Sequence, residues 1–555
     1  MTAKKVLTTI RINRPHIWAL GLLGFLLLLL RAWPRLMHPN VWDEDGTQNL
    51  PGFITSGISD LLTPVSGYLI LVPKLITMLS ASMSFVLYPF LSTLLAWCFA
   101  LFVFVVIAQA PMRLAGGVFL AVACMLIPSD PEVFGLPLYT FWWSALLLFV
   151  LIFWDANSSS QSFRAVLLFF ASLSSPVCLV TLPLFMGRAA IFKKRPTELK
   201  LAILAALCVG IQLWAMWPIS KLAPLDLPRL PQIIPVFLGG YTIGNILPRF
   251  KWMLGCLTLA YIGTGVVRNR SSRVLWGLVY LWVVSVLMSS ARVDVRYLDQ
   301  ALRGPRYFLF PFIILSWLLL QFAISDKSQW IRWLGAGLLV LGGVNALPVL
   351  GRHQDDLDWR GHVYSAIQFS EYALPIHYDG NAALSWSLPM SGSVCADLLG
   401  RDPFARPAAE RTYPYRAIQM TKLALNGLNA PDLSAIKTNE WKGLDYYSIV
   451  SGTTTLPALY EIKGSFLTSN AEVGVLTLHI RRGQQILFRS EPKSKKQRIV
   501  VAGGESNFYD ALPLTSEWVI LDFSNRLLHE EFDVRFIDGG TGWGEWSAIA
   551  VRKAN

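Results

Sequence analysis

Long apolar stretches separated by short polar segments occupy the first 350 residues of the chain. A helix that crosses a bilayer needs about 20 mostly apolar residues, each adding roughly 1.5 Å of rise. Apolar stretches near this length lie at roughly 17–37, 84–109, 114–128, 136–154, 200–217, 251–267, 274–291, 307–324 and 331–349. The pattern therefore predicts a polytopic α-helical membrane protein with about nine spans.

The region 164–191 does not fit one simple span. Ser174, Ser175 and Pro176 interrupt its apolar residues, and proline removes a backbone donor and disfavours helix in the residue before it. The polar segments on either side, "DANSSSQSFR" and "FKKRPTELK", are both expected in the cytoplasm because of their basic residues. We predict a broken re-entrant hairpin of two short helices here. A single kinked span is the alternative.

The pattern changes near Gly351, after which no stretch is long enough to cross a membrane. We expect a membrane domain over 1–350, a mixed extracytoplasmic region over 351–454 and a β-sandwich-like extracytoplasmic domain over 455–555. In this last region β-forming residues alternate with Gly, Asn and Asp turns. Its tryptophans Trp518, Trp543 and Trp546 have two interpretations, as core residues or as a face that stacks on sugars.

Composition and charge agree with a membrane protein. Hydrophobic residues make up 54% of the 555 residues and charged residues 15%, and the net charge is +13. The basic residues are scattered between apolar stretches, a distribution that suits contact with lipid head groups. They do not form the clustered stripe typical of nucleic-acid-binding proteins, so we expect no nucleic-acid partner. Basic segments before the first span, at Arg113 and near Lys193 predict a cytoplasmic N-terminus and an extracytoplasmic C-terminal domain.

Three adjacent acids, Asp43, Glu44 and Asp45, follow the first span in "HPNVWDEDGTQNLPGF". A charge close to hydrocarbon is costly and is a functional candidate by default. Adjacent carboxylates repel one another, so one of them should accept a proton near neutral pH and act as a general base. We favour Asp45, then Asp43, then Glu44, because Gly46 should allow a sharp turn after Asp45. The alternative is that these three acids are solvated residues of an outer loop without a chemical role.

A second acidic loop, "PSDPEVFG", carries Asp130 and Glu132. These carboxylates are either a secondary part of the site or caps at the start of a helix. Together with the first acidic segment they offer oxygen ligands to a divalent cation. No histidine joins them except the distant His38, so we expect no metal and no other cofactor.

Several arginines precede the span at 307 in "ARVDVRYLDQALRGPRYFLFP". On the expected topology they lie outside, against the usual bias. Guanidinium groups bind phosphate through paired hydrogen bonds. We therefore expect Arg306, Arg303 and Arg296 to bind a phosphate. The alternatives are ion pairs with Asp294 and Asp299 for Arg296 and Arg303, and contact with lipid head groups for all three.

These motifs resemble the GT-C superfamily, the multispan glycosyltransferases that use polyprenyl-phosphate sugars. "EDGTQNLPGFITSGISDLLTPVSGYLILVPKLI" looks like their first outer loop, and "RGPRYFLFP" is similar to an arginine-tyrosine element before a late span, which adds Tyr307 to the phosphate-binding set. The broken hairpin resembles the re-entrant segment of bacterial and phage O-antigen glucosyltransferases. The resemblance covers about residues 1–350, and three adjacent acids depart from the family's spaced or paired set.

The resemblance implies an inverting transfer of a sugar from a polyprenyl-phosphate donor to a surface glycan or lipid-linked acceptor, such as O-antigen or lipopolysaccharide. The reaction would take place on the outer face of a bacterial cytoplasmic membrane, with the C-terminal domain in the periplasm. Asp45 or Asp43 would take the acceptor's proton, and Arg306 with Arg303 would stabilise the leaving phosphate. A polysaccharide polymerase or ligase and a lipid-linked sugar transporter or flippase are the alternatives.

Overall fold

A computed structural model describes most of the chain and divides it into two compact units. The described residues are 16–158, 160–193, 195–216, 231–352, 354, 357, 359–367, 371–376, 387–405, 419–422, 427–441, 456–465, 474–490, 497–502, 508–511, 518–524, 528–540 and 546–553. The first unit comprises Met1–Leu36, Ser56–Ile76 and Thr93–His353. The second unit comprises Met37–Thr55, Thr77–Ser92 and Gln354–Asn555.

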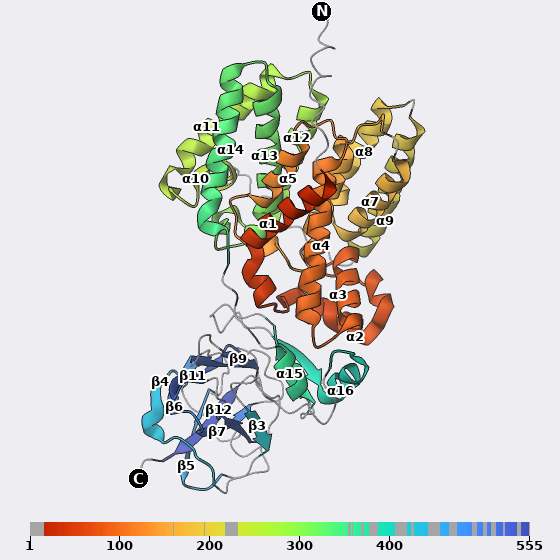
Figure 1. Cartoon of the computed structure of the whole chain (residues 1–555). Helices are drawn as coiled ribbons and strands as arrows, with labels where there is room; N and C mark the ends of the chain where they lie inside the picture. The colour runs from red at the N-terminus through yellow and green to blue at the C-terminus, as the bar shows by residue number, and fades with distance from the viewer. Residues whose placement is uncertain are drawn as a thin grey trace, which may run out of the picture. The chain divides into compact units, whose positions relative to one another are not determined.

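The first unit is helical, as the apolar stretches predict (Figure 1). Among the described residues, seven helices are long and apolar enough to cross a membrane. They are α1 (Ile17–Met37), α4 (Tyr88–Gln109), α9 (Pro196–Met216), α11 (Lys251–Arg268), α12 (Arg273–Arg292), α13 (Leu309–Ser325) and α14 (Gln329–Ala346), the helices α11, α13 and α14 each being extended by a 3₁₀ turn. A polytopic helical protein with strands in its C-terminal region is thus confirmed.

Two of the nine predicted spans form shorter helices. The stretch 114–128 gives only α5 (Gly117–Met125), because Gly116 before it has φ of 80° and leaves the helical region. The stretch 136–154 gives α6 (Thr140–Phe153), whose 14 residues are all buried. The count of nine full spans and their orientation therefore stay predictions.

The predicted break in 164–191 is present. Helix α7 (Gln161–Ser174) and helix α8 (Val177–Ile191) are separated by Ser175, with extended backbone, and Pro176. Figure 1 shows α7, α8 and α9 side by side. Glu198 of α9 joins all three helices, because its carboxylate accepts hydrogen bonds from Arg164 Nη2 at 2.8 Å and from Arg188 Nε at 2.9 Å. Both arginines are buried, so a buried ionic network links the two short helices to α9.

Helices α6 and α13 form the centre of the first unit. Every residue of α6 is buried, and most of α13 is buried as well. Phe310, the second residue of α13, contacts α6 at two places, with its ring 4.7 Å from that of Trp142 near the start of α6 and 5.4 Å from that of Phe149. Two central helices therefore begin beside one another, and the segments that precede them are brought together.

The second unit contains the first acidic segment and the strands. It includes the π-helix η1 (Asp45–Asn49), nearly all of α2 (Leu50–Ser56), the last turns of α3 (Leu71–Met83), α15 (Trp359–Ala366) and α16 (Gly392–Arg401). Strands β1 (Glu371–Pro375) and β2 (Ser387–Ser391) pair as a two-stranded antiparallel sheet. Asp402 after α16 accepts hydrogen bonds from the Ser84 hydroxyl and the Val86 amide, both at 2.8 Å, so residues far apart in sequence share this unit.

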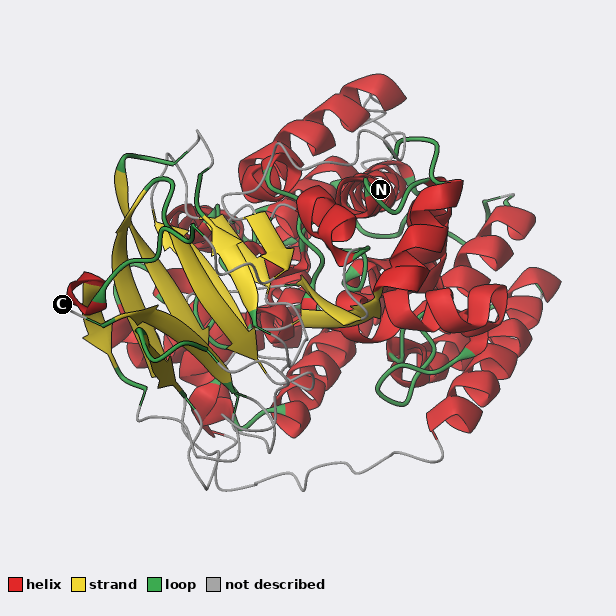
Figure 2. Ribbon diagram, turned by 90° about the horizontal axis from the view of Figure 1, so that it is seen from below, coloured by secondary structure: helices red, strands yellow, loops and turns green. Residues whose placement is uncertain are grey.

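Two five-stranded antiparallel sheets form the rest of the second unit, and their twisted strands are yellow in Figure 2. One sheet has the order β3-β10-β7-β12-β5 and the other β4-β6-β11-β8-β9. The strands are β3 (Gln419–Lys422), β4 (Ile436–Asn439), β5 (Tyr460–Gly464), β6 (Gly474–Arg481), β7 (Gln485–Ser490), β8 (Gln497–Ala502), β9 (Phe508–Ala511), β10 (Val519–Asp522), β11 (Glu531–Asp538) and β12 (Ser547–Arg552). Phe488 of the first sheet stacks on Phe536 of the second with ring centroids 6.0 Å apart, so the sheets face one another as a sandwich.

The tryptophans of this region are core residues where the structure describes them. Trp518 and Trp546 are buried in a hydrophobic cluster with Leu487, Ile520 and Ala548, on the side of the first sheet opposite Phe488. Trp543 lies outside the described residues. The interpretation of Trp518 and Trp546 as an exposed face for stacking on sugars is therefore wrong.

Candidate active site

The second acidic loop and the arginine-tyrosine element meet where the two central helices begin. Glu132 lies in the 3₁₀ turn Pro131–Val133, shortly before α6, and Arg306 lies in the 3₁₀ turn Pro305–Phe308 that leads into α13. Gly304, with φ of 68°, and Pro305 start that turn, a left-handed residue followed by a residue whose φ is already helical. The sequence "RGPRYFLFP" thus places Arg306 at a helix start, where exposed amide groups favour negative charge.

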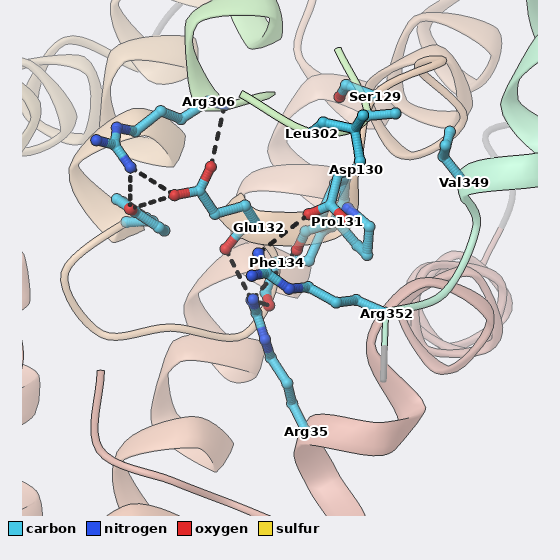
Figure 3. Close-up of polar contacts among 12 residues, drawn as sticks. Arg35, Ser129, Asp130, Pro131, Glu132, Phe134, Leu302, Arg306, Val349 and Arg352 are labelled. Atoms are coloured by element: carbon cyan, nitrogen blue, oxygen red, sulfur yellow. Dashed lines mark hydrogen bonds and ion pairs between the residues drawn. The ribbon is translucent and has the colours of Figure 1, made fainter. Parts of the chain in front are cut away.

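Glu132 is held by three donors. Its Oε1 accepts hydrogen bonds from Arg306 Nη1 at 2.5 Å and from the Tyr139 hydroxyl at 2.8 Å, and its Oε2 accepts from the Arg306 main-chain amide at 3.4 Å (Figure 3). The carboxylate is only 5% exposed. Glu132 therefore fixes the orientation of Arg306. Asp130 is the N-cap of the 3₁₀ turn, but its side chain makes no capping hydrogen bond.

Arg306 is fixed at one nitrogen and open at the others. Nη1 donates to Glu132 and to the Tyr139 hydroxyl, and the guanidinium lies over the rings of Tyr139 and Tyr307, at 5.9 Å and 5.3 Å from their centroids. Its side chain is 31% exposed. Within the described part of the chain, Nε and Nη2 have no hydrogen-bond acceptor. A positioned guanidinium with two available donors can bind an anion such as phosphate.

Two arginines of α1 hold the main chain of the acidic loop. Arg35 Nη1 donates to the carbonyls of Pro131, Glu132 and Phe134, at 3.2, 2.7 and 2.5 Å. Figure 3 shows Arg35 reaching this segment from the side opposite Arg306.

Arg31, one helical turn earlier, is fully buried. It donates to the carbonyl of Ser129 at 2.6 Å, and its guanidinium lies 4.7 Å from the centroid of the Phe134 ring. Both α1 arginines thus bring positive charge next to the acidic loop and donate hydrogen bonds to its neutral carbonyls.

Asp130 completes the cluster. Its amide donates to the carbonyl of Gln300 at 2.8 Å, and its carboxylate lies 3.5 Å from Arg352 Nη1. Burial raises the pKa of the Asp130 carboxyl above its usual value, and Arg352 and Arg35 act in the opposite direction. We call Arg31, Arg35, Asp130, Glu132, Arg306 and Arg352 the loop cluster. Four arginines against two carboxylates leave it with an excess of positive charge, which suits an anionic ligand.

The other members of the predicted phosphate-binding set have different surroundings. Arg296 forms an ion pair with Asp294 at 2.8 Å on the surface, which is the alternative considered for it. Arg303 is exposed, and its main chain is paired with that of Asp299. Tyr307 lies in the same 3₁₀ turn as Arg306, and its carbonyl accepts from the Ser289 hydroxyl at 2.8 Å. The structure thus brings Arg306 and Tyr307 together, with Arg296 bound elsewhere.

The first acidic segment belongs to the second unit and is helical. Asp43 and Glu44 begin a helical segment that continues through the π-helix η1 into α2. Asp45 is 1% exposed, and its Oδ1 accepts a hydrogen bond from Asn49 Nδ2 at 2.9 Å. Asp43 and Glu44 are half-buried. Short π-helical segments occur frequently at functional sites.

The prediction of a sharp turn at Gly46 is wrong. Gly46 lies inside η1 and is not among the described glycines with positive φ. Its small size serves packing, because a Cβ atom there would lie 2.5 Å from Cδ1 of the buried Ile376. The turn at Gly46 therefore gives no reason to prefer Asp45 as the base. Its burial and the hydrogen bond from Asn49 distinguish Asp45 from Asp43 and Glu44.

Several residues of the two regions were missed by the sequence analysis. Arg31 and Arg35 lie within the first predicted span and received no role, although basic residues four apart within an apolar helix share one face and are functional candidates. That signal was available. Tyr139, Asn49 and Arg352 carry no local signal, because their roles depend on contacts with residues distant in sequence or on burial.

No metal centre is found among the residues that the structure describes. They contain no group of three or more His, Cys, Asp or Glu side chains arranged to hold an ion. In the loop cluster the carboxylates of Glu132 and Asp130 face arginines, so their negative charge is already balanced.

Comparison with known proteins gives little information. No family model and no curated protein matches the sequence. Among solved structures, the chain is similar to that of the arabinosyltransferase EmbB from Mycobacterium smegmatis, with 12% identity and a TM-score of 0.30. The likeness covers 96% of this chain and 64% of the EmbB chain, so the chain spans less than two thirds of that enzyme's length. A TM-score this low assigns neither fold nor activity to this chain.

Proposed function

We propose that the chain is a membrane glycosyltransferase that transfers a sugar from a polyprenyl-phosphate donor with inversion of the anomeric centre. The observation that carries the proposal is Arg306, positioned by Glu132 and Tyr139 at a helix start with Nε and Nη2 available. A lipid-linked phosphate arrives already anchored in the membrane. Such a ligand suits a cluster of excess positive charge in a protein with seven candidate spans.

The proposed reaction is a single displacement at the anomeric carbon. Asp45 takes the proton from an acceptor hydroxyl. The acceptor oxygen attacks the anomeric carbon of the donor sugar, and the bond between that carbon and the phosphate oxygen breaks. The polyprenyl phosphate leaves with the bonding electron pair, and Arg306 stabilises its growing negative charge. A single displacement of this kind inverts the anomeric carbon.

The cellular setting follows from the proposed donor. We place the reaction on the outer face of a bacterial cytoplasmic membrane, with the N-terminus in the cytoplasm and the β-sandwich outside. The acceptor is a surface glycan or a lipid-linked glycan, such as O-antigen or lipopolysaccharide. No metal and no other cofactor has a role in this scheme.

The test is transfer of a labelled sugar from a defined polyprenyl-phosphate donor in membranes that contain or lack the chain. We expect label in the glycan or glycolipid fraction only where the chain is present. If label stays on the donor but crosses to the other face of sealed vesicles, the chain is a transporter. Label that appears only as assembled repeat units, with no single-sugar transfer, identifies a polymerase or ligase.

A further inference from the structure

Asn49 makes a buried contact with the proposed base that sequence analysis did not anticipate. Its side chain is fully buried, and its Nδ2 donates to Asp45 Oδ1 at 2.9 Å within the π-helix η1. The amide of Leu50 donates to the carbonyl of Asp45, which closes the wide turn and fixes the backbone that carries both side chains. Asp45 and Asn49 are thus oriented together by one local element.

The second polar atom of the Asn49 side chain is its carbonyl oxygen, Oδ1. Asn49 Oδ1 is buried and has no hydrogen-bond partner among the described residues. Nearly all buried polar atoms in native proteins find a partner, and an unsatisfied acceptor destabilises the folded state. A leucine would fill similar space without that cost. The donor contact to Asp45 is therefore the reason to retain an amide at this position.

Further buried polar groups of the same unit lie near Asp45. Tyr88 is 1% exposed and interacts electrostatically with Asp45, and Thr77 lies beside Tyr88. The surroundings of Asp45 thus hold buried hydroxyl groups besides the Asn49 amide.

We propose that Asn49 is the positioning residue that keeps Asp45 ionised and oriented to accept the proton of an acceptor hydroxyl. The proposal rests on the proposed function. Burial disfavours a charged carboxylate, and a hydrogen bond donated to its charged form offsets that effect. The Asn49 amide does this without adding a charge beside Asp45. An arginine in the same place would form an ion pair and lower the basicity of the carboxylate.

The test is the pH dependence of sugar transfer in Asn49→Leu, with Gln48→Leu, at the exposed neighbouring position, as the matched control. In Asn49→Leu we expect transfer to fall about ten- to hundredfold, the usual effect of losing a hydrogen bond to a charged group. The acidic limb of the pH-rate profile should move to higher pH by about one unit, because Asp45 would be protonated more easily. Thermal stability should stay equal or rise, and Gln48→Leu should behave as wild type.

The outcomes separate this proposal from the proposed function. If Asp45→Asn abolishes transfer but Asn49→Leu keeps the wild-type rate and profile, Asn49 has no positioning role. A reduced rate with an unmoved acidic limb also overturns the proposal, because a merely structural role predicts it. Absence of transfer by the wild-type chain contradicts the proposed function instead. If Asn49→Leu does not accumulate, Asn49→Ser, which also removes the amide donor, carries the same test.

Discussion

The two acidic segments of this protein have similar sequences and different surroundings. In "DED" the buried carboxylate of Asp45 accepts a hydrogen bond from the neutral amide of Asn49. In "DPE" the carboxylate of Glu132 is bound by a guanidinium, a phenol and a main-chain amide, and Asp130 faces Arg352. The difference shows that acids beside membrane spans are not equivalent. We propose that this difference in donors suits Asp45 to act as a base and Glu132 to position Arg306.

The largest effect is expected at the proposed base. Asp45→Asn preserves size but removes the basicity, and losing a general base typically reduces a rate by about a hundredfold to ten-thousandfold. Asp43→Asn and Glu44→Gln should have milder effects, because these side chains are only half-buried. Sugar transfer at equal protein levels in the membrane measures all three. If the three variants transfer at the wild-type rate, the first acidic segment has no chemical role.

The next effect is expected at the proposed phosphate ligand. Arg306→Lys keeps the charge but loses the planar pair of donors, and we expect about a ten- to hundredfold loss of transfer. Arg296→Lys is the matched control, because Arg296 is already paired with Asp294 at the surface, and it should transfer normally. The same loss in both variants would show that the arginines act only through net charge.

A smaller effect is expected on stability at Glu132. Glu132→Gln removes the buried negative charge that faces Arg306 while keeping the side-chain shape. We expect a loss of about 1–2 kcal/mol, because Arg306 is partly solvated and the hydrogen bonds can in part be kept. Thermal unfolding in detergent provides the measurement. A variant as stable as wild type would mean that Glu132 does not hold Arg306.

The smallest effect concerns pH and Asp130. Burial raises the pKa of this carboxyl in the folded state, so the folded chain binds a proton more readily than the unfolded chain. Its contribution to stability is therefore full below the unfolded pKa, about 3.9 for an aspartate, and is lost as pH rises through the folded pKa. We expect Asp130→Asn to raise the unfolding temperature slightly near neutral pH and to reduce its decline above about pH 4. A lower unfolding temperature at neutral pH would show that the contact with Arg352 dominates.

The sequence predicts those features that depend on local patterns. Apolar length identifies seven helices that the structure contains, and Ser175 with Pro176 predicts the break between α7 and α8. The alternation of β-forming and turn residues predicts the sandwich. These signals are local, because they follow from backbone donors, residue size and the spacing of apolar residues along the sequence.

Features of the site that depend on tertiary contacts were not predictable in the same way. The pairing of Glu132 with Arg306 joins residues 174 positions apart. The π-helix that begins at Asp45 replaced the turn expected from Gly46, whose small size serves contact with the distant Ile376. Glycine in a sequence does not distinguish a positive φ from a close approach, since both require the absence of a side chain.

The most direct test of the difference between the segments is steady-state transfer from a defined polyprenyl-phosphate sugar by the wild-type chain, Asp45→Asn and Glu132→Gln. Asp45→Asn should lower kcat with little change in the KM for the donor, because a base acts only in the transition state. Glu132→Gln should instead raise the donor KM, because it disorders Arg306 and weakens binding of the phosphate. The same change in kcat and KM in both variants would contradict the division of roles between the two acidic segments.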